Sequence, residues 1–313
     1  MKCVVTGAAG FIGSRLAARL LAAGHSVAGV DCFTDYYPRR IKEGNLAPLR
    51  TSPSFQFLAE DLNVMDLGRL LDGADAVFHY AAQAGVRASW GTSFEAYLAN
   101  NIRATQRLLE AARGRPLRRF VFASSSSVYG ATPDLPMRET SPVQPLSPYG
   151  VTKLAAEHLC LLYHRNHGVP ALALRFFTVY GPGQRPDMAF HRFFQALAEG
   201  REITLYGDGS QTRDFTYVDD IVSGSLAALD GGRAGEVYNV GGGHRERLAD
   251  VIRVMEEVAG RKARVVRHEA QKGDVPDTLA DIGKARAELG YAPRTALPDG
   301  LREEWTWLGR ISS

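Results

Sequence analysis

Two residues in the middle of this sequence could move a proton. Tyr149 and Lys153 are separated by one helical turn, so on a helix they lie on the same face. A phenol ordinarily ionises near pH ~10, and a neighbouring ammonium favours the phenolate. The pair could therefore supply a general base at neutral pH. Because this spacing also arises by chance, the prediction needs support from other parts of the chain.

A run of hydroxyl side chains precedes this pair. Ser124, Ser125, Ser126 and Ser127 follow directly on an apolar segment that ends at Ala123 and that we expect to be a strand. Ligands of α/β proteins bind beyond the carboxyl ends of the strands. Hydroxyls at that place can hydrogen-bond to a sugar hydroxyl that is being oxidised.

The first glycine loop has a form that binds a dinucleotide. Gly7, Gly10 and Gly13 lie between an apolar run and a helical pattern, and Phe11 and Ile12 belong to the same loop. Glycines let the backbone turn tightly and approach a pyrophosphate, which the N-terminus of the helix then stabilises. The sequence therefore predicts a dinucleotide cofactor at this loop.

We expect this cofactor to be NAD rather than NADP. Asp31 ends the second predicted strand, about 20 residues beyond the glycine loop, as the dinucleotide fingerprint requires. A carboxylate there accepts hydrogen bonds from both ribose hydroxyls and repels a 2′-phosphate. Asp61 and Leu62 follow the third predicted strand and could meet the adenine.

The elements that position these residues form one pattern. Predicted strands alternate with predicted helices, the strands at residues 2–6, 26–30, 55–58, 76–79 and 119–123, and the helices at 11–23, 94–113 and 149–167. Ser147 can cap the last of these helices and Pro148 can begin it. Parallel strands need crossover helices that bury both faces of the sheet. We therefore predict an α/β fold with a doubly wound parallel sheet of the Rossmann type.

A second region follows this sheet. After residue 178 the alternation weakens and loops with glycine and proline become frequent, while further patterns occur at 248–258, 263–266 and 301–308. We predict a Rossmann domain over residues 1–178, to which later segments return. Residues 179–313 then form mainly a smaller α/β region that covers the carboxyl edge of the sheet and binds substrate.

Composition limits the function classes. Lys and Arg number 37 against 34 Asp and Glu, and they are scattered, so a nucleic-acid role is not indicated. Cys3, Cys32 and Cys160 lack CxxC spacing, which favours buried, reduced thiols over disulfides or a metal site. The chain starts with a strand pattern and has no long apolar span, so we expect a cytoplasmic protein without a membrane segment.

With these motifs in place, the chain resembles the extended short-chain dehydrogenase/reductase family over essentially its whole length. Within that family it is most similar to the nucleotide-sugar 4-epimerases. Beyond the glycine loop, the serine run and the Tyr149–Lys153 pair, the resemblance rests on HYAAQ at 79–83, NN at 100–101, RFFTVYGP at 175–182, RDF at 213–215, VDD at 218–220 and GDVP at 273–276.

The resemblance implies a mechanism. Tyr149 removes the proton from the sugar 4-hydroxyl while hydride passes from C4 to NAD, with Ser125 at the family's catalytic Ser/Thr position. Lys153 holds the nicotinamide ribose and keeps Tyr149 acidic. The 4-keto sugar then rotates and takes the hydride back on its other face. The resemblance also places several residues around the cofactor, namely Tyr80, Ala81, Ala82, Gln83, Asn100, Ala123 and Phe176.

The resemblance further implies a UDP-sugar substrate. Arg213 matches the family's diphosphate-binding arginine, and a guanidinium suits that ligand. Tyr206, Gln211 and Asp274 match neighbours of the uridine and its ribose. Gln271 stands where many 4-epimerases have arginine, which leaves the second phosphate contact open.

The choice of sugar depends on fewer residues. Related 4,6-dehydratases and UDP-glucuronate decarboxylases carry Glu where this chain has Ser127, which disfavours both. The segments 35–37, 82–87 and 185–189 look most like UDP-glucuronate 4-epimerases. The C5 carboxylate of that substrate needs a cation or hydroxyls, and the candidates from these segments and their neighbours are Arg185 first, Thr178 second and Arg87 third, with Met188 and Ala189 beside them.

Several alternatives stay open. Arg185 could instead pair with an acidic residue of its own loop, and the substrate could be UDP-glucose or an N-acetyl sugar. A non-catalytic NAD-sensing module is a further alternative, although it would not need Ser125, Tyr149 and Lys153. By analogy with the family we expect a homodimer, formed through the helices at 94–113 and 149–167.

Overall fold

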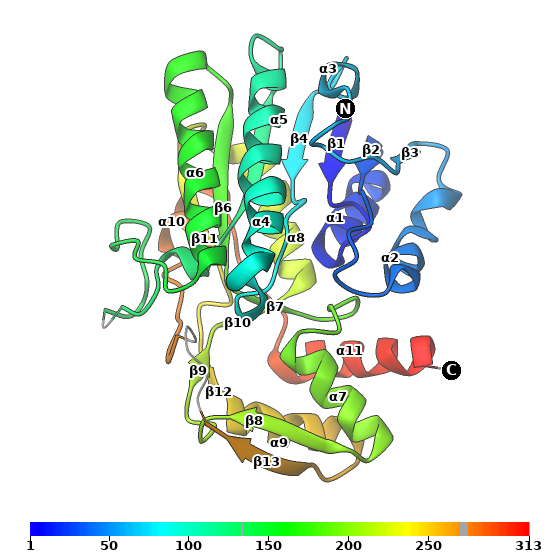
Figure 1. Cartoon of the computed structure of the whole chain (residues 1–313), viewed down its shortest axis with the longest axis vertical. Coiled ribbons are helices and arrows are strands. Elements are labelled where there is room, and N and C mark those ends of the chain that lie inside the picture. Colours follow the sequence, from blue (N-terminus) through cyan, green and yellow to red (C-terminus); the bar gives the residue numbers. More distant parts are fainter. Residues whose placement is uncertain (133, 270–274, 313) are drawn as a thin grey trace.

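The computed structural model describes residues 1–132, 134–269 and 275–312. Its main feature is a seven-stranded sheet in the order β11-β6-β5-β4-β1-β2-β3, in which all neighbours are parallel (Figure 1). The order reverses beside β1, where a doubly wound sheet opens its ligand crevice. The strands are β1 Lys2–Thr6, β2 Ser26–Val30, β3 Phe55–Leu58, β4 Ala76–His79, β5 Arg119–Ser125, β6 Ala171–Phe176 and β11 Val237–Val240.

The first four predicted strands have the bounds that the sequence indicated. The fifth, β5, extends two residues beyond the predicted end at Ala123. Ser124 and Ser125 continue the ladder opposite Arg175 and Phe176 of β6. The catalytic serine candidate is therefore the last residue of a strand, where the sheet fixes its backbone.

Helices cover both faces of the sheet, as predicted. Val5 packs with α1 (Phe11–Ala22), α2 (Arg39–Leu46) and α8 (Val218–Gly231), whereas its neighbour Val4 packs with the helices of the other face. This alternation is expected of a strand that is buried on both sides. The helices of the second face are α3 (Leu67–Leu70), α5 (Ala104–Ala112) and α6 (Pro148–His167).

The long helix predicted at residues 94–113 is interrupted. It consists of α4 (Phe94–Tyr97), a π-helical turn at Leu98–Arg103, and α5. Such π turns insert one extra residue into a helix and are frequent at functional sites. The turn contains Asn100, which lines the cavity described below, and Asn101, which is buried.

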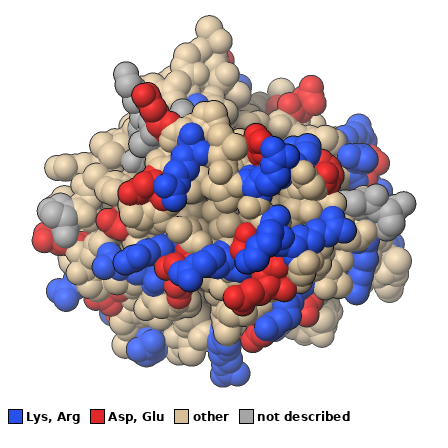
Figure 2. Space-filling view, turned by 90° about the horizontal axis from the view of Figure 1, so that it is seen from below, with Lys and Arg blue, Asp and Glu red and all other residues tan. Residues whose placement is uncertain are grey.

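A smaller lobe lies below the carboxyl edge of the sheet (Figure 1). Three two-stranded sheets contribute to it, in which β7 (Thr178–Tyr180) pairs with β10 (Phe215–Tyr217), β8 (Glu202–Tyr206) with β13 (Arg264–His268), and β9 (Thr212–Arg213) with β12 (Glu246–Arg247). Its helices are α7 (Ala189–Glu199), α9 (Leu248–Ala259) and α11 (Leu297–Ser312), while α10 (Gly283–Leu289) packs beside α8 and β11. Figure 2 shows that basic and acidic side chains are interspersed over the face seen from below.

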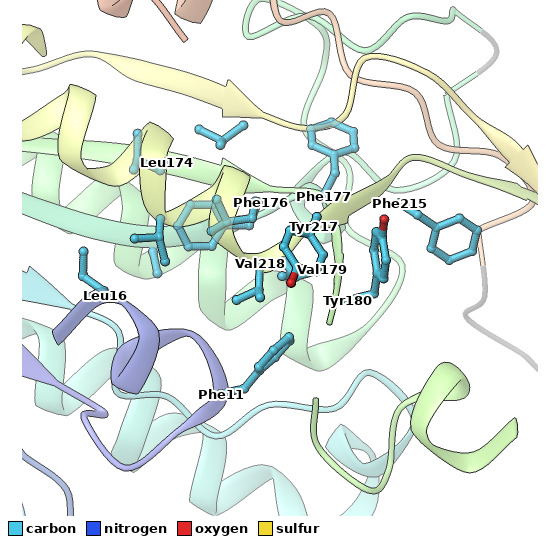
Figure 3. Close-up of a cluster of buried hydrophobic side chains, with 14 of the residues drawn as sticks. Phe11, Leu16, Leu174, Phe176, Phe177, Val179, Tyr180, Phe215, Tyr217 and Val218 are labelled. Atoms are coloured by element: carbon cyan, nitrogen blue, oxygen red, sulfur yellow. The ribbon is translucent and has the colours of Figure 1, made fainter. Parts of the chain in front are cut away.

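One apolar cluster joins the sheet to this lobe. It runs from Phe11 and Leu174 through Phe177 to Tyr180 and Phe215 (Figure 3). The rings of Phe190 and Phe215 lie 4.6 Å apart, and those of Tyr180 and Tyr217 lie 5.6 Å apart. The two parts therefore share a core at their junction. The division that we predicted at residue 178 stays a prediction.

Three expectations about composition can be compared with the described residues. Cys3 and Cys160 are buried free thiols as expected, but Cys32 is exposed because it begins the loop after β2. Among the described residues, no group of three or more His, Cys, Asp or Glu side chains is placed to hold a metal ion. Within the same residues, no helix is long and apolar enough to cross a membrane.

Candidate active site

A cavity of about 690 Å³ lies at the carboxyl edge of the sheet and extends to the smaller lobe. It brings together almost all of the predicted site residues, which are Gly7, Gly10, Phe11, Ile12, Gly13, Asp31, Asp61, Leu62, Tyr80, Ala81, Ala82, Gln83, Arg87, Asn100, Ala123, Ser125, Ser126, Ser127, Tyr149, Lys153, Phe176, Thr178, Arg185, Met188, Ala189, Tyr206 and Gln211. Arg213 does not line it, and Asp274 lies outside the described residues.

The glycine loop fits the pyrophosphate of a dinucleotide. A Cβ added to Gly13 would lie 2.1 Å from the carbonyl oxygen of Gly7, and one added to Gly7 would lie 2.8 Å from the amide of Ala81. The backbone is thus packed against itself and leaves its other side to the cavity. Gly10, the N-cap of α1, has no side-chain hydrogen bond to the first turn, so the helix N-terminus remains open to an anion.

Asp31 lies at the end of β2, where the fingerprint requires a carboxylate. Its Oδ2 accepts a hydrogen bond from the amide of Ala9 at 3.2 Å and its Oδ1 accepts one from the amide of Phe33 at 2.9 Å. Burial raises the pKa of Asp31, and these two bonds together with the charge of Lys42 lower it. The carboxylate is therefore fixed in direction at the rim where an adenosine ribose would lie.

The helix α6 begins as predicted and positions the base candidate. Ser147 is the N-cap and accepts a hydrogen bond from the amide of Gly150, and Pro148 is the first helical residue. This start places Tyr149 in the first turn, at the cavity, and its ring packs edge-on against Tyr97 with the centroids 6.3 Å apart.

The electrostatic surroundings of Tyr149 differ from our expectation. Burial raises the pKa of its phenol, while a hydrogen bond with Ser125 and then the charge of Arg185 lower it. We expected Lys153 to be the cation with this effect. The ammonium of Lys153 instead donates to the carbonyl of Ala123 at 2.9 Å, and burial lowers the pKa of Lys153 to about 8. Arg185 thus adds a cation that favours the phenolate, which the sequence did not predict.

A buried ion pair ties α6 to the end of β5. Glu157 lies one turn after Lys153 and is 1% exposed. It accepts hydrogen bonds from the hydroxyl of Ser124 at 2.6 Å and from both Nε and Nη2 of Arg175 on β6, at 3.0 and 2.6 Å. Paired and hydrogen-bonded in this way, the carboxylate is satisfied in the core. Two successive strand residues, Ala123 and Ser124, are thereby joined to the helix that carries Tyr149.

Asn101 connects the segment after β4 to α6 at the edge of the site. Its Oδ1 accepts from the amide of Gln83 at 2.7 Å, and its Nδ2 donates to the carbonyl of Gln83 at 3.0 Å and to the hydroxyl of Thr152 at 2.9 Å. The π turn thus joins the segment after β4 to α6. Sequence reasoning selected Asn100 as the cofactor residue, and Asn100 does line the cavity.

Arg185 is paired within its own loop, the alternative that the sequence left open. Its Nε and Nη2 donate to the two carboxylate oxygens of Asp187 at 2.9 and 3.0 Å, and Tyr36 donates to the same carboxylate at 3.2 Å. The pair uses one edge of the guanidinium. A guanidinium has five N–H donors, so its terminal edge can still bind a second carboxylate.

Two of the candidate arginines make contacts that the sequence did not predict. Arg87 was the third candidate for the C5 carboxylate, but its guanidinium stacks on the ring of Tyr206 at 4.4 Å, so it lies with the residue that the family pattern assigns to the uridine. Arg213, the diphosphate candidate, donates from Nη1 to the carbonyls of Thr212 and Pro276, both at 2.8 Å. Both contacts arise from loop conformation, which spacing in the sequence does not encode, and the substrate roles of both arginines stay predictions.

Four charged residues of the cavity were missed by sequence reasoning, namely Lys42, Glu60, Asp187 and Arg192. A signal existed for Lys42, because Leu46 marks the buried face of α2 and lies one turn after it. Asp187 had only been considered as an unnamed acidic partner. Arg192 lies on the exposed side of an amphipathic pattern and gave no signal.

Comparison with known proteins agrees with this geometry. The NAD dependent epimerase/dehydratase family matches residues 3–241. A protein of Bacillus subtilis (strain 168) named as an uncharacterized UDP-glucose epimerase, YtcB, is 47% identical over 313 residues, with 99% of each chain covered. A UDP-glucuronate 4-epimerase of Thermodesulfobacterium geofontis (strain OPF15) is 40% identical, with 97% of this chain and 95% of that protein covered.

A solved structure is similar over the same length. The crystal structure of UDP-glucuronic acid 4-epimerase from Bacillus cereus, in complex with UDP-glucuronic acid and NAD, superposes with a TM-score of 0.97 at 46% sequence identity, covering 99% of this chain and 100% of that one. The fold thus has a counterpart in a solved structure, and the chain belongs to the NAD dependent epimerase/dehydratase family.

Proposed function

We propose that this chain is an NAD-dependent 4-epimerase that interconverts UDP-glucuronate and UDP-galacturonate. The observation that carries the proposal is the position of Arg185, a cation close enough to Tyr149 to lower the pKa of its phenol. Because Arg185 lines the same cavity as Tyr149, its guanidinium can pair with the C5 carboxylate of a sugar whose C4 hydroxyl contacts Tyr149. The family relationship and the matching names of the relatives support the same substrate.

Tyr149 is the proton acceptor and donor in this proposal. Its phenol, hydrogen-bonded to Ser125, takes the proton of the C4 hydroxyl and returns it after the 4-keto sugar has rotated. Ser125 ends a strand, so its hydroxyl has a fixed position from which to hold the C4 oxygen. Bound NAD supplies the hydride acceptor and returns the same hydride, so no net oxidation results.

Lys153 holds the cofactor in place. Its ammonium is fixed by the carbonyl of Ala123, and the remaining N–H groups can donate to ribose hydroxyls. The first turn of α1 and the glycine loop bind the pyrophosphate, and Asp31 accepts from the adenosine ribose. Since the reaction returns NAD unchanged, the site has no need to release it between turnovers.

The nucleotide of the substrate would lie toward the smaller lobe. Tyr206 and Gln211 line the cavity there, and Gln211 is held by a bond to the carbonyl of Tyr206 at 2.8 Å. Arg213 remains our candidate for one phosphate. Arg192, which lines the cavity from α7, offers a cation for the second phosphate, which the sequence had left open because of Gln271.

The second candidate function is 4-epimerisation of neutral UDP-sugars, with UDP-glucose as the foremost substrate. The Arg185–Asp187 ion pair favours it, because a guanidinium already neutralised by its neighbour can border an uncharged C6 hydroxyl. The name of the B. subtilis relative points the same way. A 4,6-dehydratase or decarboxylase is less well supported, because those reactions use an additional acid beside the serine run and this chain has Ser127 there.

Assembly and location stay predictions. We propose a homodimer formed through α4–α5 and α6, because α6 carries Val151 and Leu162 with 48% and 52% of their surface exposed, and Trp90 near α4 is 54% exposed. Large apolar side chains exposed on helices that lie side by side are typical of an interface. Cytoplasmic location also remains an expectation from the sequence.

One assay tests the proposal. Purified protein is incubated with NAD and, separately, with UDP-glucuronate, UDP-glucose and UDP-N-acetylglucosamine, and the 4-epimers are separated by chromatography. We expect UDP-galacturonate from the first substrate and slower conversion of the neutral sugars. Conversion of neutral sugars alone would overturn the hexuronate assignment, and binding of NAD without any conversion would favour a sensing module.

A further inference from the structure

Two opposite charges lie at the adenosine end of the cavity. Asp31 follows β2 directly, and Lys42 approaches from α2, the helix that comes after the next loop. Both side chains line the cavity, together with Thr34 and Tyr37 of that loop. The preference for NAD over NADP was predicted from Asp31 alone, and Lys42 adds a cation near that carboxylate.

Lys42 is held inside the protein rather than on its surface. The residue is 4% exposed, and its Nζ donates to the carbonyl of Thr34 at 2.7 Å and to the hydroxyl of Thr34 at 3.3 Å. The same ammonium lies 4.7 Å from the centre of the Tyr37 ring. Ordering a lysine side chain costs entropy and burying its charge costs solvation. These contacts offset both costs, so the cation stays at this place.

The two charges influence each other. Burial lowers the pKa of Lys42, and the charge of Asp31 is the first effect that raises it again. Lys42 in turn lowers the pKa of Asp31. Because both side chains also line the same cavity, the carboxylate and the ammonium can face one ligand.

The loop between them is rigid. Phe33 has a φ of 53°, in the left-handed region that non-glycine residues rarely adopt. Its amide donates to Asp31, and the guanidinium of Arg39 stacks on its ring at 4.4 Å. These contacts fix the backbone between the carboxylate and Thr34, which binds the ammonium. The spacing of the two charges is thus set by the fold.

We propose that Lys42 is a cofactor-specificity residue, and that the site prefers NAD because the carboxylate of Asp31 outweighs a lysine that could otherwise bind the 2′-phosphate of NADP. The inference rests on the proposed NAD site. A phosphate monoester carries about −1.5 to −2 charges near neutral pH and offers three acceptor oxygens, which suit an ammonium. Asp31 opposes this phosphate by repulsion. Once that charge is removed, Lys42 becomes its partner.

A double-mutant cycle tests this. Wild type, Asp31→Asn, Lys42→Met and the double variant are stripped of nucleotide and titrated calorimetrically with NAD and with NADP. Asn removes the charge and keeps one oxygen to accept from Ala9 or Phe33, and it loses the other of these two hydrogen bonds. Because a hydrogen bond to a charged group contributes about 1.5–3 kcal/mol, we expect Asp31→Asn to bind NADP at least about tenfold more tightly than wild type. The double variant should lose that gain.

Arg40→Met is the matched control. Arg40 is exposed on the same helix, so this change removes an equal charge close to Lys42 without touching the cavity. In the Asp31→Asn background it should leave the gain in NADP affinity intact. The proposal is overturned if the Lys42→Met double variant binds NADP as tightly as Asp31→Asn, or if Arg40→Met removes the gain equally well.

Two further measurements keep the test decisive. Should Asp31→Asn fail to fold, as circular dichroism would reveal, Lys42→Met alone must weaken the residual NADP binding of the wild type more than its NAD binding, and an equal loss contradicts the proposal. The titration of wild type with NAD separates this inference from the proposed function. If the wild type does not bind NAD, the proposed function is wrong. If it binds NAD but the double-mutant cycle shows no coupling between Asp31 and Lys42 for NADP, only the role of Lys42 is wrong.

Discussion

The cavity has two walls that are built from different parts of the polypeptide. The cofactor wall, formed by the glycine loop at 7–13 and the segments that follow β2 and β4, is mostly backbone in close contact with itself. The substrate wall, formed by residues 178–189 and by the loops of the smaller lobe, acts through the side chains of Arg185, Tyr206 and Gln211. Backbone geometry cannot be altered gradually, whereas side chains can be exchanged one at a time. A side chain added to a glycine of the cofactor wall should therefore abolish cofactor binding, whereas a changed side chain of the substrate wall should alter selectivity.

Gly13→Ala should have the largest effect on the cofactor wall. The new Cβ would lie 2.1 Å from the carbonyl oxygen of Gly7, and a backbone atom cannot move aside cheaply. We expect the purified variant to retain no NAD and to be inactive on every UDP-sugar, measured as nucleotide released on denaturation and as turnover.

Gly44→Ala is the control for this methyl group. A Cβ on Gly44 in α2 meets no atom within 4 Å, so NAD should be retained and the free energy of unfolding should rise by about 0.5–1 kcal/mol. A Gly13→Ala protein that keeps a full complement of NAD would show that the cofactor wall is as adaptable as the substrate wall.

Tyr149→Phe acts where the two walls meet. It removes the oxygen that transfers the proton and leaves the ring against Tyr97, so turnover should fall by at least about 10²–10⁴-fold while the dissociation constant of the UDP-sugar stays nearly unchanged. Ser125→Ala should be milder. Tyr163→Phe, on the same helix but bonded to Glu110 outside the cavity, should keep wild-type turnover. Normal turnover of Tyr149→Phe would mean that another group is the base.

Arg185→Ala tests the substrate wall and should change substrate selectivity more than it changes activity on neutral sugars. Loss of the guanidinium leaves a hexuronate carboxylate unpaired, which costs several kcal/mol, so activity on UDP-glucuronate should fall by about 10²-fold or more and that on UDP-glucose much less. The selectivity ratio is the quantity to measure. Arg192→Ala should lower both activities by a similar factor. A parallel fall for Arg185→Ala would remove that residue from the carboxylate site.

The sequence predicted the cofactor wall in more detail than the substrate wall, for a physical reason. The requirements of the glycine loop, of Asp31 and of the start of α6 are local, since a turn, a strand end and an N-cap each depend on a few consecutive residues. The hydrogen bond that Ser147 accepts from Gly150 and the start of the helix at Pro148 are examples of structure that such local signals predict.

The substrate wall depends on how loops far apart in the sequence meet. Residue spacing did not predict that Arg87 stacks on Tyr206 or that Arg213 donates to nearby carbonyls. Nor did it predict that the charge of Arg185 lowers the pKa of Tyr149. The π turn that directs Asn101 toward Gln83 was equally hidden, because the sequence does not show where one extra residue is inserted into a helix.

Glu304 adds a constraint of a different kind to the substrate wall. Its carboxyl group is buried on α11 and accepts a hydrogen bond at 2.9 Å from the amide of Gly181, at the base of the loop that carries Arg185, across a separation of 123 residues. During synthesis the glycine leaves the ribosome long before its partner has been added. The Rossmann sheet can begin to form in that interval, since its first six strands precede residue 177. The loop that carries Arg185 gains its hydrogen bond to Glu304 only after α11 has been synthesised. A newly made chain would therefore form its cofactor site before its sugar site.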